Sequence, residues 1–165
     1  MTVERERRFL LTKLPPGEPV DRTTIRQAYW QLGSGWSLRV RREGTSNDDT
    51  RNSITVKGPR SGFSRPELEF FLSSDAAVTR VVENLFQVAG NHKIIKTRHS
   101  YVLDGLAWDV DEFHWENEGL VIAEIELEDS DQLAGVTPPT WAVREVTNDS
   151  QYANENLAIR PYRNW

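Results

Sequence analysis

The sequence predicts an α+β protein in which an antiparallel β-sheet curls or closes into a barrel and helices pack on its outside. Seven segments alternate apolar with ionised residues, and a period of two places successive side chains on opposite faces of a strand. Glycine, proline, asparagine and aspartate separate these segments at hairpin distances. A meander of this many strands tends to curl or close, and 165 residues suit a single domain over residues 1–165.

The first strand is expected from Glu4 to Leu11. Its residues Glu4, Glu6 and Arg8 share one face, since their spacing is two. Charged residues are poor strand formers, and an ordinary core-facing strand would place Val, Ile or Leu at every second position. Taken alone, this pattern is also typical of a solvated edge strand. Its recurrence along the chain favours a functional interpretation.

The same alternation recurs in six further segments. These are residues 36–42, 54–58, 65–70, 94–102, 108–113 and 120–128. Pro66 indicates that its strand starts irregularly or lies at an edge. A less regular strand is expected over residues 25–32, and a short strand-like piece over 141–146. Residues 44–52 are expected to form a hairpin loop.

Two helices are expected. Residues 77–89 carry apolar side chains at helical spacing, and the preceding Ser73, Ser74 and Asp75 offer an N-cap. A closing helix is expected over residues 149–158. If the sheet closes with its charged face inward, its apolar face points outward, and helices of this kind are needed to cover it.

The charged faces of the strands carry both signs. The cations are Arg8, Arg39, Arg41, Lys57, Arg65, Lys96 and Arg98. The carboxylates are Glu4, Glu6, Glu67, Glu69, Asp109, Asp111, Glu124, Glu126 and Glu128. On an open sheet these residues would form a solvated face. In a closed barrel with that face inward they would line a water-filled tunnel of mixed charge.

The composition narrows the classes of function. A net charge of −5 argues against a nucleic-acid partner held by bulk charge. The absence of cysteine excludes disulfides, thiolate metal sites and cysteine nucleophiles. The three histidines lack metal-ligand spacing, so oxygen ligands and a hard cation such as Mg²⁺, Mn²⁺ or Ca²⁺ are expected. No apolar run approaches a signal peptide or membrane span, so we expect a cytoplasmic protein without a membrane partner.

A tunnel of clustered charges is costly unless a ligand satisfies both signs, because like charges perturb one another's pKa. Arginine and lysine bind phosphate oxygens, and carboxylates hold hard metal ions that bridge protein and phosphate. A polyanion that carries a divalent cation meets both demands. The pattern therefore indicates a metal-dependent phosphoryl-transfer site, with the solvated sheet as the alternative.

Over nearly its whole length the chain resembles the CYTH family, also called triphosphate tunnel metalloenzymes. The opening E-x-E-x-K signature is similar to Glu4-x-Glu6-x-Arg8. Further family elements are similar to Arg39-x-Arg41, Thr55-x-Lys57, Arg65-x-Glu67-x-Glu69, Lys96-x-Arg98, Asp111 and Glu124-x-Glu126. Glu145-Val146-Thr147 and Tyr152-x-Asn154-x-x-Leu157-Ala158 resemble the closing motif of small bacterial members.

The resemblance implies an eight-stranded antiparallel tunnel that binds or turns over a small-molecule triphosphate with Mg²⁺ or Mn²⁺. The implied ligands of the metal that grips the triphosphate are Asp111, Glu124 and Glu126. The implied catalytic residues are Glu4 and Glu6, which would hold a second metal and the attacking water, and Arg8 at the signature lysine. The implied phosphate clamp is Arg39, Arg41, Lys57, Arg65, Lys96 and Arg98. Apolar barrel exteriors often pair, which allows a homodimer.

The chain departs from the family pattern at four positions, in three places. Arg8 replaces the signature lysine and cannot give up a proton at ordinary pH, although it can still bind phosphate. Trp115 stands where small members often have glycine. Ser150 and Gln151 stand where basic residues often precede the tyrosine. The latter two changes are expected at the tunnel mouth.

Several functions remain open at this stage. We expect an inorganic triphosphatase that hydrolyses tripolyphosphate to pyrophosphate and phosphate. The same frame also supports a class IV-type adenylate cyclase, which forms cyclic AMP and pyrophosphate from ATP, or a thiamine triphosphatase. A non-catalytic module that binds polyphosphate or nucleotide is the further alternative, and Arg8 is its main support.

Overall fold

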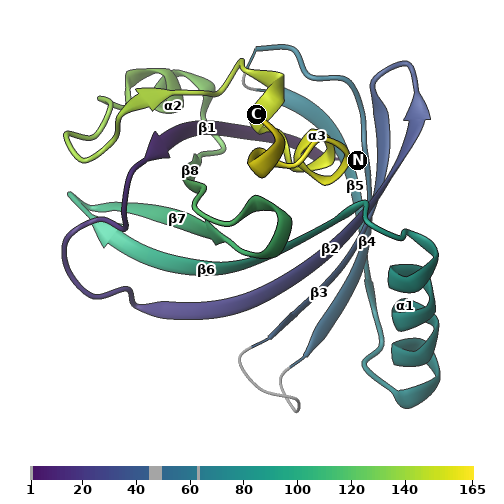
Figure 1. Cartoon of the computed structure of the whole chain (residues 1–165). Helices are drawn as coiled ribbons and strands as arrows, with labels where there is room; N and C mark the ends of the chain where they lie inside the picture. The colour runs from purple at the N-terminus through teal and green to yellow at the C-terminus, as the bar shows by residue number, and fades with distance from the viewer. Residues whose placement is uncertain (1, 45–49, 63) are drawn as a thin grey trace.

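Eight strands form a closed antiparallel barrel in the computed structural model, which describes residues 2–44, 50–62 and 64–165 (Figure 1). The strands are β1 (Thr2–Leu11), β2 (Asp21–Gly33), β3 (Trp36–Gly44), β4 (Arg51–Lys57), β5 (Ser64–Leu72), β6 (Lys93–Leu103), β7 (Leu106–Phe113) and β8 (Val121–Glu126). Each is bonded to its neighbour in the order β5-β4-β3-β2-β6-β7-β8-β1, and pairing of β5 with β1 closes the ring. The predicted eight-stranded tunnel fold is confirmed.

Strand β1 closes the barrel by changing partners along its length. Its residues 2–5 pair with β5, whereas residues 6–11 pair with β8 on the other side. Beyond Arg5, where the pairing with β5 stops, the two-residue strand β9 (Arg144–Glu145) lies opposite Phe9 and Leu10. The split places the start of β1, with its two glutamates, at the seam of the barrel.

The strand boundaries differ from the predicted ones mainly at the hairpins. Part of the predicted loop, residues 45–49, lies outside the described residues. Strand β4 begins at Arg51, three residues before the prediction, because Arg51, Asn52 and Ser53 pair with the end of β3. Strand β8 ends at Glu126, so the prediction that Glu128 belongs to a strand was wrong.

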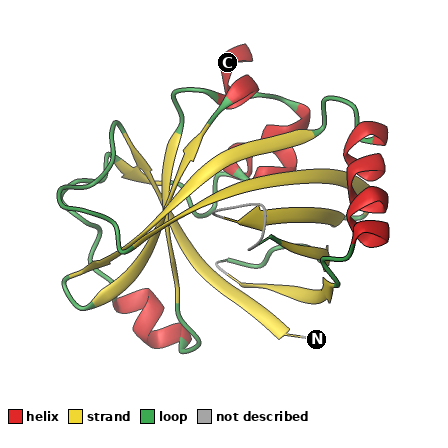
Figure 2. Cartoon of the chain, turned by 90° about the horizontal axis from the view of Figure 1, so that it is seen from below, coloured by secondary structure: helices red, strands yellow, loops and turns green. Residues whose placement is uncertain are grey.

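Helix α1 (Ala76–Val88) covers the outer face of β2 and β3, as predicted. Asp75 caps it by accepting hydrogen bonds from the backbone N–H groups of Ala77 and Val78. Its Val82 and Phe86 are buried with apolar side chains of the two strands. Figure 2 shows this long helix lying along one side of the strands.

The end of the chain is less regular than predicted. The expected helix over 149–158 is two pieces, a 3₁₀ turn η2 (Ser150–Tyr152) and helix α3 (Asn154–Ile159). Extended backbone at Ala153 separates them, with φ −72° and ψ 136°. The expected strand 141–146 is reduced to β9. The short helix α2 (Ser130–Gly135) was not predicted, since its six residues are too few to show a period.

Two further 3₁₀ turns complete the chain, η1 (Trp115–Asn117) and η3 (Tyr162–Asn164). Trp115 has a φ of 57°, in the left-handed region that side chains other than glycine rarely adopt. This backbone conformation accounts for the glycine that the family resemblance led us to expect there. No helix in the described part of the chain is long and apolar enough to cross a membrane.

One end of the barrel interior is apolar. Leu10, Ile94, Phe113 and Ile122 lie on the same strand faces as charged residues two positions away, and Leu120, just before β8, joins them in one apolar cluster. The C-terminal segment packs on them through residues that include Val146, Tyr152, Leu157 and Ala158. The interior is therefore a plugged apolar end joined to a charged end.

Candidate functional site

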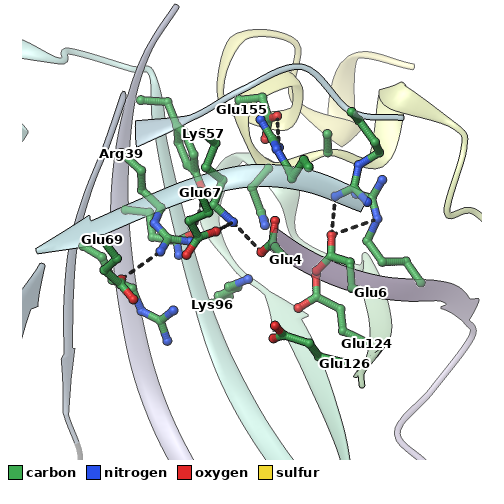
Figure 3. A pocket seen from close by; sticks show the side chains of 18 of the residues that line it. Glu4, Glu6, Arg39, Lys57, Glu67, Glu69, Lys96, Glu124, Glu126 and Glu155 are labelled. Atoms are coloured by element: carbon green, nitrogen blue, oxygen red, sulfur yellow. Dashed lines mark hydrogen bonds and ion pairs between the residues drawn. The ribbon is translucent and has the colours of Figure 1, made fainter. Parts of the chain in front are cut away.

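The charged end of the barrel encloses a cavity of about 170 Å³ (Figure 3). Ionised residues from β1, β3, β4, β5, β6 and β8 point into it, as their alternation along each strand requires. The lining residues are Glu4, Glu6, Arg8, Gln27, Tyr29, Arg39, Arg41, Lys57, Arg60, Arg65, Glu67, Glu69, Lys96, Arg98, Glu124, Glu126, Ala153, Asn154 and Glu155. All seven cations expected on the inner face are among them.

Three of the nine carboxylates expected on the inner face do not line this cavity. Glu128 lies beyond the end of β8 and is exposed. Asp109 bonds to Arg98 and Ser100, and its side chain is 40% exposed. Asp111 is fully buried behind two cations. The expectation of nine tunnel carboxylates is therefore corrected to six among the described residues.

The first two glutamates are held by cations from the β4 strand and the turn after it. Lys57 Nζ lies 2.5 Å from Glu4 Oε1 and 2.8 Å from Glu67 Oε2. Arg60 Nη2 lies 2.6 Å from Glu6 Oε1. The other carboxylate oxygen of Glu4, Oε2, is buried and has no hydrogen-bond partner. This region has surplus acceptor capacity, which a cation would satisfy.

Glu126 adds to the negative charge there, because it lies directly opposite Glu6 in the β1–β8 register. Burial raises the pKa of Glu126, and the neighbouring Glu4, Glu6 and Glu67 raise it further. Lys57 offsets this repulsion only in part, so a further cation would stabilise the ionised cluster. The possible metal ligands are carboxylate oxygens, which suit hard cations such as Mg²⁺ or Mn²⁺.

A second cluster surrounds Asp111. Its carboxylate accepts hydrogen bonds from Lys96 Nζ at 2.5 Å and from Arg98 Nε and Nη2, each at 2.8 Å. Burial alone would raise the pKa of Asp111, but Arg98 and Lys96 hold it well below its usual range. Burial lowers the pKa of Lys96. The predicted role of Asp111 as a metal ligand would require these two cations to release it.

Glu124 lies between the two clusters and accepts a hydrogen bond from Arg98 Nη2 at 2.6 Å. Burial, with the nearby charges of Asp111 and Glu6, raises the pKa of Glu124 to about 7. A carboxyl group that is costly to ionise in this way becomes easier to ionise when a cation binds beside it. Glu124 therefore fits the metal-ligand role that the resemblance implies.

Two arginines on β3 supply positive charge that the described carboxylates do not fully use. Arg39 Nη2 bonds to Thr55 at 2.8 Å and to Glu69 at 3.2 Å, and Arg41 pairs with Glu43. Burial lowers the pKa of Arg41, and the neighbouring Arg98 and Arg39 lower it further. The Nε atoms of Arg39 and Arg41 are buried without a hydrogen-bond partner. An anion in the cavity would satisfy them.

Arg8, by contrast, has both terminal nitrogens bound to the fold, although its Nε is also buried without a hydrogen-bond partner. Its Nη1 donates to the carbonyl of Tyr152 at 2.9 Å and its Nη2 to the carbonyl of Thr147 at 3.0 Å. Its Nε lies 3.7 Å from Glu6, beyond hydrogen-bond distance. The residue at the signature lysine thus fastens the C-terminal segment to β1.

Arg65 is similarly engaged. It donates from Nε and Nη2 to the carbonyl of Gly58 at 3.1 and 2.9 Å, and from Nη1 to Glu155 at 2.7 Å. It remains part of the cavity wall, but its donors are directed at the protein. Arg65 therefore stabilises the β4–β5 turn, in addition to its predicted role in binding phosphate.

Sequence reasoning missed six lining residues: Gln27, Tyr29, Arg60, Ala153, Asn154 and Glu155. Strand β2 lacks the ionised alternation, so nothing marked Gln27 or Tyr29 as inward, although Tyr29 donates to Gln27 at 2.9 Å. Burial raises the pKa of Tyr29. Arg60 lies on a turn, where strand alternation carries no information. Glu155 reaches the cavity from α3, whose position is set by packing.

No three of the described acidic or histidine residues already converge as a metal cage. The cavity carboxylates are instead paired with lysine and arginine. Glu4 lies 2.5 Å from Lys57, and Glu6 lies 2.6 Å from Arg60. A phosphate chain would compete for the same cations. The unpartnered Glu4 Oε2 and the hard-oxygen donor set still fit a divalent cation.

Comparison with known proteins agrees with this geometry. The CYTH domain model matches residues 3–162. An inorganic triphosphatase of Acetivibrio thermocellus is 38% identical over 165 residues, which cover 100% of this chain and 99% of that protein. An inorganic triphosphatase of Nitrosomonas europaea is 32% identical over 158 residues, with coverage of 94% and 97%.

A solved structure has the same fold. The crystal structure of the inorganic triphosphatase NE1496 superimposes with a TM-score of 0.68 at 30% identity and covers 96% of each chain. The matched region includes the inward-facing charged strands that surround the cavity. On the family match, the two full-length relatives and the shared fold, this chain belongs to the CYTH domain family.

Proposed function

We propose that this protein is an inorganic triphosphatase that hydrolyses tripolyphosphate to pyrophosphate and phosphate. One observation carries the proposal. The closed barrel brings eight lysine and arginine side chains and seven glutamates together in one cavity of about 170 Å³, a size and charge suited to a compact polyanion with its metal ion. The two inorganic triphosphatases that match 100% and 94% of the chain support the same reaction.

The chain's own residues would divide the work by charge. Arg39, Arg41 and Lys57 are now paired with carboxylates and could exchange these partners for phosphate oxygens. The unpartnered Nε atoms of Arg39 and Arg41 could also donate to phosphate. They would neutralise charge that spreads over the transferred phosphoryl group. Glu4, Glu6, Glu124 and Glu126, which line the same cavity, supply oxygen ligands for a metal ion. No covalent intermediate is required.

We further propose that Mg²⁺ or Mn²⁺ is the metal cofactor, held by these glutamates. When bound, the metal would bridge protein and phosphate and lower the cost of forming a water-derived nucleophile. Arg8 does not serve as a general base in this scheme, since a guanidinium stays protonated and both of its terminal nitrogens are bound to carbonyls. A cytoplasmic location and a homodimer stay predictions.

The second candidate is a non-catalytic module that binds polyphosphate. The arginine at the signature lysine favours it, because the position offers no group that can take a proton. Tight binding of tripolyphosphate without release of phosphate would support this candidate.

The test is an assay of the purified protein with tripolyphosphate, ATP or thiamine triphosphate, each with Mg²⁺, Mn²⁺ or EDTA. We expect metal-dependent phosphate release that is fastest from tripolyphosphate and is lost in Glu4→Gln and Glu126→Gln. Cyclic AMP and pyrophosphate from ATP would identify an adenylate cyclase instead. Fastest release from thiamine triphosphate would identify a thiamine triphosphatase.

A further inference from the structure

Arg60 reaches the cavity from the turn between β4 and β5, unlike the cations that line it from the strands. Its side chain is 20% exposed, so it lies at the rim of the site. A turn can present a long side chain at an angle that a strand cannot. Arg60 is therefore placed to act on the part of a ligand that is nearest to solvent.

The turn is held firmly at its base. Arg65 donates two hydrogen bonds to the carbonyl of Gly58, and the N–H of Gly58 donates to the carbonyl of Pro66 at 2.9 Å. A Cβ on Gly58 would come within 2.4 Å of Pro66 Cγ, so this close packing needs glycine. Ser61 and Ser64 then bond to each other through their backbones. The anchoring fixes where the Arg60 side chain starts.

The guanidinium of Arg60 is only partly satisfied. Its Nη2 contacts Glu6 Oε1 at 2.6 Å, whereas its Nη1 is buried and has no hydrogen-bond partner. A buried hydrogen-bond donor without a partner costs free energy and is rare in native proteins. The unpaired Nη1 of Arg60 is therefore explained if a ligand accepts its hydrogen bond. The two nitrogens form a fork whose geometry matches two oxygens of one phosphate group.

Glu6 cannot serve this arginine and a metal ion equally well. Its register partner is Glu126, and Glu4 lies nearby on the same strand face, so a cation bound among these carboxylates would draw on the oxygen that Arg60 now holds. Loss of that contact would leave both terminal nitrogens of Arg60 without a hydrogen-bond acceptor. The outer phosphoryl group of a bound triphosphate would provide them.

We propose that Arg60 is a substrate-binding residue that rests on Glu6 in the metal-free protein and transfers its guanidinium fork to a terminal phosphoryl group when a metal ion occupies Glu6. The inference rests on the proposed function, since it takes a metal-bound triphosphate as the ligand. It makes metal binding and phosphate binding cooperative through one side chain. Binding of each favours the other by the same factor.

Calorimetry with the nonhydrolysable imido analogue of tripolyphosphate tests the first half of the proposal. In Mg²⁺, we expect Arg60→Ala to bind the analogue about 10- to 100-fold more weakly, the range for losing hydrogen bonds to a charged group. Arg60→Lys should be intermediate, because an ammonium cannot match the two-oxygen fork. Equal affinity of Arg60→Ala and the unaltered protein would overturn the proposal.

The matched control is Arg42→Ala. Arg42 pairs with Glu83 at 2.8 Å and its side chain is 23% exposed, close to the values for Arg60, but it lies on the outer face. We expect less than a twofold change in analogue affinity for this variant. A thermal melt of each variant checks that the fold is retained.

The exchange itself is tested without metal. In EDTA, Glu6→Gln should bind the analogue more tightly than the unaltered protein, because Arg60 is released from its carboxylate. The gain should disappear when Arg60→Ala is added to Glu6→Gln. If the gain persists in the double variant, the general loss of negative charge explains it and the exchange is refuted.

These measurements are distinguishable from a failure of the proposed function. If the protein hydrolyses no triphosphate but the Arg60 variants weaken analogue binding as stated, the hydrolase fails and the binding role stands. If hydrolysis proceeds and Arg60→Ala changes neither analogue affinity nor the KM for tripolyphosphate, the role of Arg60 fails alone.

Discussion

The two ends of the barrel interior are built on the same strand faces but behave differently. At one end Ile94 and Ile122 are buried, and Leu10 is partly buried, in the apolar cluster that includes the C-terminal segment. Two residues along the same strands, Arg8, Lys96 and Glu124 face the charged cavity. The apolar end is complete as it stands, whereas the charged end contains buried polar atoms without partners. The difference indicates that the apolar end stabilises the fold, whereas the charged end is suited to bind a ligand that satisfies its unpartnered polar atoms.

Removing the plug should produce the largest loss of stability. Leu157 of α3 is fully buried at the apolar end, so Leu157→Ala should lower the free energy of unfolding by about 2–5 kcal/mol. Ile159 of the same helix is 45% exposed and makes the control, since its truncation should cost far less. Urea denaturation measures both. Equal losses would show that the C-terminal segment does not plug the barrel.

Ligand binding should stabilise the charged end by a comparable amount. The imido analogue of tripolyphosphate with Mg²⁺, at 100 times its Kd, should raise the free energy of unfolding by about 2.7 kcal/mol. Lys57→Ala should lose most of this increment at the same ligand concentration, because Lys57 is one of the cavity cations. Leu157→Ala should keep it. A full increment in Lys57→Ala would argue against its role in binding.

Arg8 tests where the boundary between the two ends lies. Its two hydrogen bonds to the carbonyls of Thr147 and Tyr152 are buried, so Arg8→Ala should cost about 1.5–3 kcal/mol of unfolding free energy. Limited proteolysis should then cut the C-terminal segment faster. The exposed Arg22→Ala serves as control. If Arg8→Ala were as stable as that control, the anchoring role would be refuted.

The smallest expected effect is a pH dependence outside the barrel. Arg7 forms two hydrogen bonds with Glu145, at 2.9 and 2.8 Å, and these bonds lower the pKa of Glu145. A lowered carboxyl pKa contributes stability above the unfolded-state value, and the contribution is lost as pH falls through the folded-state value. Stability should therefore decline on acidification below about pH 4.5.

The Glu145→Gln variant isolates this contribution. Its stability curve should be flatter over that acid range than that of the unaltered protein, by well under 1 kcal/mol because the pair is partly exposed. Denaturation at a series of pH values measures the slope. Identical slopes would show that the pair adds nothing to stability.

Strand alternation predicted much of the barrel and its inner face. Since side chains alternate strictly along a strand, the spacing of Arg39 and Arg41, or of Glu4 and Glu6, determined that each pair shares a face, whatever the tertiary structure. All seven expected cations line the cavity for this reason. The helix after Asp75 was equally local, because its cap and its apolar period lie within one short segment.

Only the tertiary structure decided which of those charges remain available to a ligand. Register places Lys96 and Arg98 on Asp111, and the folded-back C-terminal segment occupies Arg8. The turn that brings Arg60 to Glu6 joins residues 54 positions apart. The predicted closing helix is split at Ala153, next to the Tyr152 carbonyl that accepts a hydrogen bond from the distant Arg8. Periodicity reports the direction of a side chain on its own strand, whereas its partner depends on contacts between distant segments, which no local pattern encodes.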